Sequence, residues 1–199
     1  MTSPRLPRRL GLPLVLLLVA AFLSVSEAAA VSSVCISRYG QTVVQRGSAR
    51  CESDSTSVAI VRGDNSYATA SNHGRATVSG SSSEAHAHDF GGAIVNGDRS
   101  SADAAGQDNI ATVNGTGSEA VATNGNNNVA SVVGNFSNAF AGNGDNNVAT
   151  VSGDESDALA GNGNNNKATI NGDMSQAAAQ APAGCDAVVA VDNGAESCP

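Results

Sequence analysis

Residues Val148–Ala160 read VATVSGDESDALA, and this short phrase decides the fold. Seven copies of it share the pattern x-A-x-[VI]-x-G-x-x-S-x-A-x-A. A repeat of this length cannot bury its own apolar face, so it is stable only when neighbouring repeats stack. The sequence therefore predicts an all-β solenoid, a β-helix or β-roll of about seven coils of 17 to 19 residues over residues 58–180. The copies begin at Val58, Arg75, Gly92, Ile110, Val129, Val148 and Lys167.

The shared residues of each copy alternate with period two, and successive residues of a strand point to opposite faces of a sheet. The recurring Ala, Val and Ser are therefore predicted to point inward. One buried Val contributes about 1.5–3 kcal/mol, whereas ordering the backbone of one residue costs about 1–2 kcal/mol. Burial alone cannot hold such a coil, so we expect hydrogen-bond ladders between coils. We also expect stacked amides at the Asn-rich corners 126–128, 145–147 and 164–166.

The two ends of the chain do not follow the repeat. Residues 1–30 run from a basic start through an apolar segment to Ala28, Ala29 and Ala30, the order typical of a secretory signal peptide cleaved near Ala30. No second apolar run of bilayer-spanning length follows, so we expect no transmembrane anchor after cleavage. Residues 31–57 and 181–199 are predicted to cap the first and last coils, whose open strand edges would otherwise pair with another chain.

The four cysteines lie in two pairs outside the repeats, and disulfides persist in oxidising compartments. Three pairings are possible. Cys35–Cys51 and Cys185–Cys198 are favoured, because each closes a short loop within one end of the array. The pairing agrees with a secreted protein that is extracellular or held at the cell surface.

Charge and composition narrow the classes of function. The full chain carries a net charge of −8; without residues 1–30, which hold three arginines and one glutamate, the net charge is −10. Binding to nucleic acid is disfavoured because no basic patch neutralises phosphates. No acidic cluster backed by basic residues is present for general acid and base chemistry. We therefore expect a protein that is not an enzyme and uses no cofactor, and a polysaccharide-active enzyme is the least favoured alternative.

Two weak metal-site hypotheses remain. His86 and His88 share one strand face, and Asp103 occupies the neighbouring position of the next coil, so these side chains are candidate zinc ligands. A column of carboxylates follows the recurring Gly, and its oxygens are candidate calcium ligands. In the alternative interpretation, each of these Asp residues forms an Asx turn toward the nearby Ser. The column contains Asp64, Asp98, Asp154 and Asp173.

The outward columns offer two candidate surfaces. One is an apolar stripe in the second strand of the later coils, and exposed apolar patches commonly mark interaction sites. Coils four to seven are therefore predicted to contact a second copy or another partner, unless a loop or the segment 188–191 folds over the stripe. A column of hydroxyls in the first strand is the other surface: Thr77, Thr112, Ser131, Thr150 and Thr169. The apolar stripe comprises Val121, Phe140, Leu159 and Ala178.

Two local resemblances extend this interpretation. Gly153, Ser156, Ala158, Ala160 and Gly163 resemble the phrases that form the head of trimeric autotransporter adhesins, which implies a left-handed β-roll and an adhesive role. Residues 147–153, NVATVSG, resemble the phrases of grass ice-binding β-rolls, which implies a flat Thr-bearing face. The sequence thus predicts a secreted, noncatalytic repeat protein with a structural or adhesive role. The alternative is a ligand-binding β-solenoid for ice or calcium.

Overall fold

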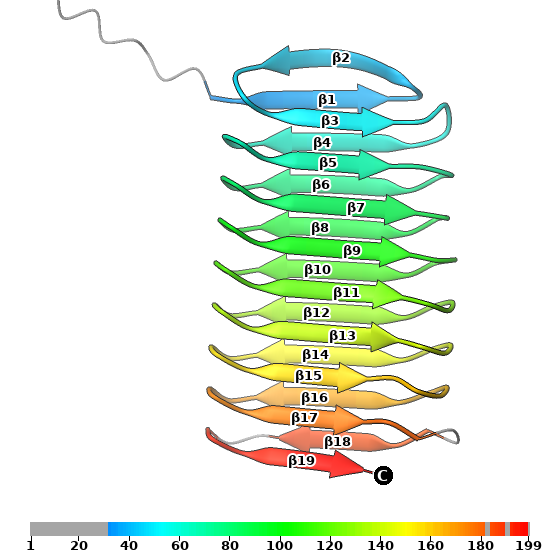
Figure 1. The fold of residues 1–199 in the computed structure, drawn as a ribbon, viewed down its shortest axis with the longest axis vertical. Helices are drawn as coiled ribbons and strands as arrows, with labels where there is room; N and C mark the ends of the chain where they lie inside the picture. The colour runs from blue at the N-terminus through cyan, green and yellow to red at the C-terminus, as the bar shows by residue number, and fades with distance from the viewer. Residues whose placement is uncertain (1–31, 182–183, 190–191, 199) are drawn as a thin grey trace, which may run out of the picture. The chain divides into compact units, whose positions relative to one another are not determined.

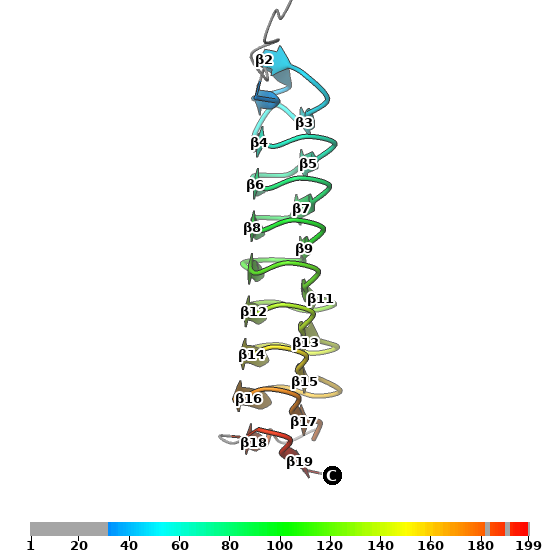
Figure 2. The ribbon, with the colours of Figure 1, turned by 90° about the vertical axis from the view of Figure 1, so that its left-hand side faces the viewer.

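The computed structural model describes residues 32–181, 184–189 and 192–198, and the predicted signal peptide lies outside these residues. Each coil contributes one strand to each of two facing sheets, and the stack has about eight turns. Figure 1 shows the strands of successive coils lying one above another, and Figure 2, turned by 90°, shows the two sheets edge-on. Among the described residues there is no helix, and so none that could span a bilayer. The predicted all-β solenoid is confirmed.

Sheet A is formed by the first strand of each coil, and its strands follow one another from the C-terminal to the N-terminal edge. They are β18 (Asp186–Val189), β16 (Lys167–Asn171), β14 (Val148–Ser152), β12 (Val129–Val133), β10 (Ile110–Asn114), β8 (Gly92–Asn96), β6 (Arg75–Ser79), β4 (Val58–Arg62), β1 (Val34–Arg38) and β2 (Gln41–Arg46).

Sheet B is formed by the second strand of each coil, and its strands are given in the same order, from the C-terminal to the N-terminal edge. Its strands are β19 (Ala195–Cys198), β17 (Gln176–Ala179), β15 (Asp157–Ala160), β13 (Asn138–Gly142), β11 (Glu119–Thr123), β9 (Ser101–Ala105), β7 (Glu84–His88), β5 (Tyr67–Ala70) and β3 (Arg50–Ser53). Every pairing in this sheet is parallel, so that each residue lies beside the equivalent residue of the next coil.

The core is a set of columns of small side chains between the two sheets. The recurring Ala and Val of sheet A and the paired Ala of sheet B are buried, as the alternation predicts. Val61, Val132 and Ile170 belong to the one column of larger side chains, and all three are completely buried. Because most of the other core residues are Ala, the two sheets face each other across a thin interior.

A column of serines provides hydrogen bonds inside the first corner of each coil, where sheet A passes to sheet B. The Ser66 hydroxyl donates to the carbonyl of Gly80 in the next coil at 2.7 Å and accepts from the backbone N–H of Ser83 at 3.1 Å. The same pair of bonds recurs through Ser83, Ser100, Ser118, Ser137 and Ser156. These hydroxyls satisfy backbone groups that would otherwise be buried without partners.

A buried column of asparagines has the same function at the second corner of the later coils. The Oδ1 atom of Asn147 accepts from the Asn166 backbone N–H at 2.9 Å, and its Nδ2 donates to the carbonyls of Gly142 and Gly163. Only the last Asn of each corner is buried: Asn109, Asn128, Asn147 and Asn166. The corner asparagines stack in register as predicted, but their side chains bond to backbone groups instead of to one another. Side-chain amides bond to each other in a separate, exposed column outside the predicted corners, which runs through Asn124, Asn143 and Asn162.

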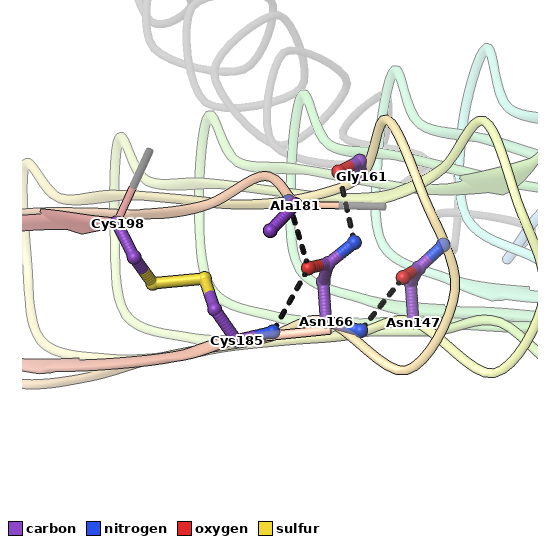
Figure 3. Close-up of a disulfide and its surroundings, with 6 residues drawn as sticks. All are labelled: Asn147, Gly161, Asn166, Ala181, Cys185 and Cys198. Atoms are coloured by element: carbon purple, nitrogen blue, oxygen red, sulfur yellow. Dashed lines mark hydrogen bonds between the residues drawn. A yellow bond between two sulfur atoms is a disulfide. The ribbon is translucent and has the colours of Figure 1, made fainter. Parts of the chain in front are cut away.

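One disulfide joins sheet A to sheet B near the N-terminal end, and the other joins the corner before β18 to sheet B near the C-terminal end. Cys35 lies beside Val61 of sheet A and is bonded to Cys51 of sheet B; Cys185 occupies the position of the buried Asn column and is bonded to Cys198. Figure 3 shows this second bridge beside Asn166, whose Oδ1 accepts from the N–H groups of Ala181 and Cys185. Both predicted pairings are confirmed. Each bridge restricts the unfolded chain and so stabilises the coil that it closes.

The solenoid continues past both ends of the repeat array. β3 pairs in parallel with β5, and β18 and β19 extend both sheets by another coil, so the two flanks contribute strands as well as closing the ends. At the N-terminal edge, β2 pairs antiparallel with β1 through an irregular register. At the C-terminal edge, Glu196 takes the position that inward Ala177 has in the previous coil. A hairpin with a bulge and an edge charge both oppose pairing with another strand.

Substitution of the recurring Gly at the first corner tests how closely the backbones of neighbouring coils approach each other. A Cβ added to Gly134 would lie 1.9 Å from the carbonyl oxygen of Gly153 in the next coil, whereas a Cβ on Gly92 would meet nothing within 4 Å. We expect Gly134→Ala to lower the free energy of unfolding by at least ~2 kcal/mol, because backbone must move apart. Gly92→Ala is expected to raise the free energy of unfolding by about 0.4–1 kcal/mol, because alanine lowers the conformational entropy of the unfolded chain. Guanidinium unfolding monitored by circular dichroism measures both; similar midpoints would contradict tight contact at the glycine column.

Candidate functional site: the outward face of sheet B

The predicted apolar stripe forms one continuous column on the outward face of sheet B. Val121 pairs with Phe140, Phe140 with Leu159, and Leu159 with Ala178, each in the middle of its strand. All four side chains are half-buried. Since neighbouring parallel strands lie about 4.8 Å apart, the stripe is roughly 15 Å long.

Two glycines lie beside the aromatic ring of the stripe. Gly142 and Gly161 are buried beside the Phe140 ring: a Cβ on Gly142 would lie 3.1 Å from the ring Cζ, and one on Gly161 would lie 3.6 Å from Cε1. The ring therefore extends over two positions that have no side chain. Sequence reasoning missed both glycines, and their one signal is that each occurs two residues after a stripe residue.

Polar side chains border the stripe on the side of the first corner. Glu119, Asn138, Asp157 and Gln176 occupy the neighbouring outward column and are exposed, and Asn138 donates to Asp157 at 2.8 Å. A shallow hollow of about 420 Å³ lies at the C-terminal end of the stripe, where Leu159 and Ala178 meet Asp157, Gln176 and Ser197. An apolar strip with a polar border and an adjacent hollow is the usual composition of an interaction surface.

The alternative in which the segment 188–191 folds over the stripe is wrong for the described part of that segment. Val188 and Val189 belong to β18, which pairs with β16 in sheet A, on the opposite side of the solenoid. Residues 190–191 lie outside the described residues. Parallel pairing with the previous coil satisfies the backbone of β18, and a reversal over sheet B would not. The described residues leave the stripe uncovered.

His86, His88 and Asp103 are brought to the neighbouring coils of sheet B, as the spacing predicts. His86 and His88 are half-buried on β7, and Asp103 lies beside His86 on β9. Each imidazole Nδ1 is already engaged by a hydroxyl, Thr69 at 2.7 Å and Ser71 at 2.5 Å. In the part of the chain that the structure describes, no group of three potential metal ligands lies close enough to hold an ion.

The contacts of His86 also define the strongest arrangement for nucleophilic chemistry. Its Nδ1 contacts the Thr69 hydroxyl, and its Nε2 lies 3.6 Å from a carboxylate oxygen of Glu84. Hydroxyl, imidazole and carboxylate are the components of a catalytic triad. Thr69 and His86 are, however, directly opposite residues of paired strands, where a hydroxyl–imidazole hydrogen bond is an ordinary cross-strand contact. A hollow of about 650 Å³ nearby is lined by Glu52, Tyr67 and Glu84, but neither Thr69 nor His86 is among its lining residues.

The Asp column has a structural use that differs from the expected Asx turns. The Oδ1 atom of Asp154 accepts from the backbone N–H of Asn135 in the preceding coil, and the Oδ1 atom of Asp173 accepts from that of Asp154. Asp98 bonds the N–H of Ser81 in the same way, and Asp64 accepts from the hydroxyl of Ser33 in the N-terminal cap. Corner carboxylates therefore connect consecutive coils, because the rise of one strand spacing places each one above an amide of its neighbour.

Asp54 makes a similar connection at the second corner. The hydrogen bond from the Asn72 backbone N–H holds the pKa of Asp54 well below its usual range. Because the folded pKa is lowered, the stabilisation is present above the unfolded value of about 3.9 and is lost as the pH falls from there toward the folded value.

The hydroxyl column of sheet A is in strict register. Thr112, Ser131, Thr150 and Thr169 are paired residue by residue on the outward face. The columns on both sides vary in size and charge, from Arg62 and Ser79 to Val133, and do not form a second rank of Thr. The outward face of sheet A therefore has one regular column of hydroxyl side chains.

Comparison of this chain with family models, with curated proteins and with solved structures found no match. The proposed role of the protein therefore rests on the geometry of the two faces and on the local resemblances of the repeat.

Substitution of Asp154 separates a structural carboxylate from a calcium ligand. Asp154→Asn keeps the Oδ1 acceptor for the Asn135 N–H, so we expect a change in the free energy of unfolding within ~0.5 kcal/mol, whereas Asp154→Ala is expected to cost about 1 kcal/mol. Thermal melts with and without millimolar calcium give both comparisons. A calcium-dependent rise in the melting temperature of the unsubstituted protein that disappears in Asp154→Asn would contradict this and identify a calcium site.

Proposed function

We propose that this protein is a secreted, noncatalytic repeat protein with a structural or adhesive role at the cell surface or in the extracellular matrix. It binds its partner through the apolar stripe on sheet B. The observation that carries the proposal is the stripe itself: four apolar residues in register, with the Phe140 ring beside two buried glycines, and uncovered among the described residues. Isolated apolar residues are common on surfaces, but a continuous column with a polar border marks a contact site.

The construction of the solenoid supports a mechanical role. Side-chain hydrogen bonds and parallel ladders connect every described coil of the array to the next, and a disulfide closes the coil near each end. The disulfides agree with an oxidising, extracellular location. A repeat scaffold of this kind presents its outward columns at fixed intervals, which suits repeated or extended contacts.

Phe140→Ser combined with Leu159→Ser tests this role. Both side chains point away from the core, so we expect the melting temperature to change little while binding weakens at least tenfold, because the central apolar area is lost. Sedimentation velocity of the secreted protein and retention of labelled protein by the cells that secrete it are the two readouts.

The matched control is Phe136→Ser. Phe136 is more exposed, at 64%, and lies on the corner of the same coil; Ser82 occupies the equivalent corner position with a similar φ, so serine fits there. The control should bind like the unsubstituted protein. Equal binding by the stripe variant and the unsubstituted protein in both assays would show that the stripe is not the working surface.

Ice remains the second candidate ligand, supported by the hydroxyl column of sheet A and its strict register. Thermal hysteresis of the secreted protein is the direct assay. A measurable freezing-point gap that is lost on Thr112→Val and Thr150→Val would assign sheet A to ice.

A further inference from the structure

The two outward faces of the solenoid carry charges of opposite sign. Sheet A presents only basic charged side chains from β1 to β16, and they lie at the two ends of the stack. The outward positions of these strands contain no Asp or Glu. The basic residues are Arg38, Arg62, Arg75 and Lys167, all exposed.

Sheet B presents acidic side chains instead. Its outward positions from β5 to β17 contain no Lys or Arg, and the only base of the neighbouring β3 is Arg50. These negative charges affect Tyr67. Partial burial raises the pKa of its hydroxyl, and the charges of Glu52 and Glu84 raise this pKa further. The acidic residues are Glu52, Glu84, Asp103, Glu119 and Asp157.

Apolar side chains lie on both outward faces at two shared levels, the coils of β10–β11 and β12–β13. Sheet A exposes Ile94, Ile110 and Val133, at 44%, 47% and 52%, on three successive strands, β8, β10 and β12. The stripe of sheet B occupies β11, β13, β15 and β17, so the two apolar zones overlap along the stack. Toward the N-terminal end, the basic start of sheet A lies at the level of Glu52, Glu84 and Asp103.

We propose that the partner of the sheet B stripe is sheet A of a second copy of this chain. With parallel axes and nearly equal levels, the two apolar zones overlap in the coils of β10–β11 and β12–β13, and the basic N-terminal end of sheet A lies at the level of the acidic N-terminal end of sheet B. Pairing of identical faces would place like charges together, and such contacts are disfavoured. The inference rests on the proposed function, because it names the occupant of the same surface.

The contact is heterologous, because each copy uses a different surface. When every copy makes the same contact with the next one, the copies form an open row that does not close into a ring. Five residues across and eight strands along give a face on the order of 600 Å², from spacings of about 3.3 and 4.8 Å. A standard stable interface buries about 800 Å² on each partner. The association is therefore weak for a pair and depends on concentration, while each copy within a row gains two contacts.

Complementation between two variants tests the heterologous contact. Phe140→Ser with Leu159→Ser disables sheet B and leaves sheet A intact, whereas Arg75→Glu with Ile110→Glu disables sheet A and leaves sheet B intact. Each variant alone should sediment as a monomer. Mixed in equal amounts they should form a one-to-one dimer that grows no further, because only one pair of intact faces is available. The unsubstituted protein should gain mass steadily with concentration and lose mass at high salt.

Three results would overturn the inference. The proposed function would then still be tested by the cell-retention assay. One result is dimerisation of the sheet A variant alone, which indicates contact between two B faces. Another is failure of the mixture to exceed monomer mass, and the third is an unsubstituted protein that stays monomeric at every concentration. Retention that is lost with the stripe variant would then indicate a different partner.

Circular dichroism and melting temperature confirm that each variant is folded before mixing. Arg75→Gln with Lys167→Gln provides a milder second test, since both side chains are exposed and only charge is removed. We expect at least a tenfold loss of association constant and a weaker salt dependence; an unchanged association constant would contradict the charge pairing.

Discussion

The contact on which the rest of the structure depends is the close approach of one glycine backbone to the next along the first corner. A Cβ on Gly63, Gly115 or Gly134 would lie within 2 Å of the carbonyl oxygen of the following coil, so only glycine allows coils to stack at one strand spacing. At that spacing every residue lies beside its equivalent, and the interior can be built from columns. The buried Ser and Asn side chains then bond from coil to coil, and each column extends the one before it.

This construction constrains the inward side chains much more than the outward ones. An inward residue must fit a thin space and satisfy groups of two coils at once, which explains why the inner columns of Ala, Val, Ser and Asn vary so little. Outward residues experience no such limit. The charges, hydroxyls and apolar side chains of the two faces are therefore free to differ, and their arrangement carries the proposed adhesion and self-association.

Parts of the candidate site could be predicted from the sequence. The spacing of Phe140 and Leu159 placed them on one outward column, and the loop lengths favoured the correct disulfides. The position of the Phe140 ring beside Gly142 and Gly161 could not be predicted, because it depends on the direction in which a side chain lies within its column. The alternative interpretation of Asp154 and Asp173 as Asx turns differs from the bonds that they make: a local turn is visible in a sequence, whereas a bond to an amide of the previous coil depends on how far the corner protrudes.

The sequence by itself determined the repeat length, the inward columns and the two-residue alternation, because a stack of equivalent strands repeats every constraint at a fixed period. Only the tertiary structure decided which corner atoms bond to which coil, how the end strands continue the sheets and which charges share a face. Those outcomes depend on the return of the chain from sheet A to sheet B. The return assigns basic and acidic residues, interleaved along the sequence, to opposite sides of one solenoid.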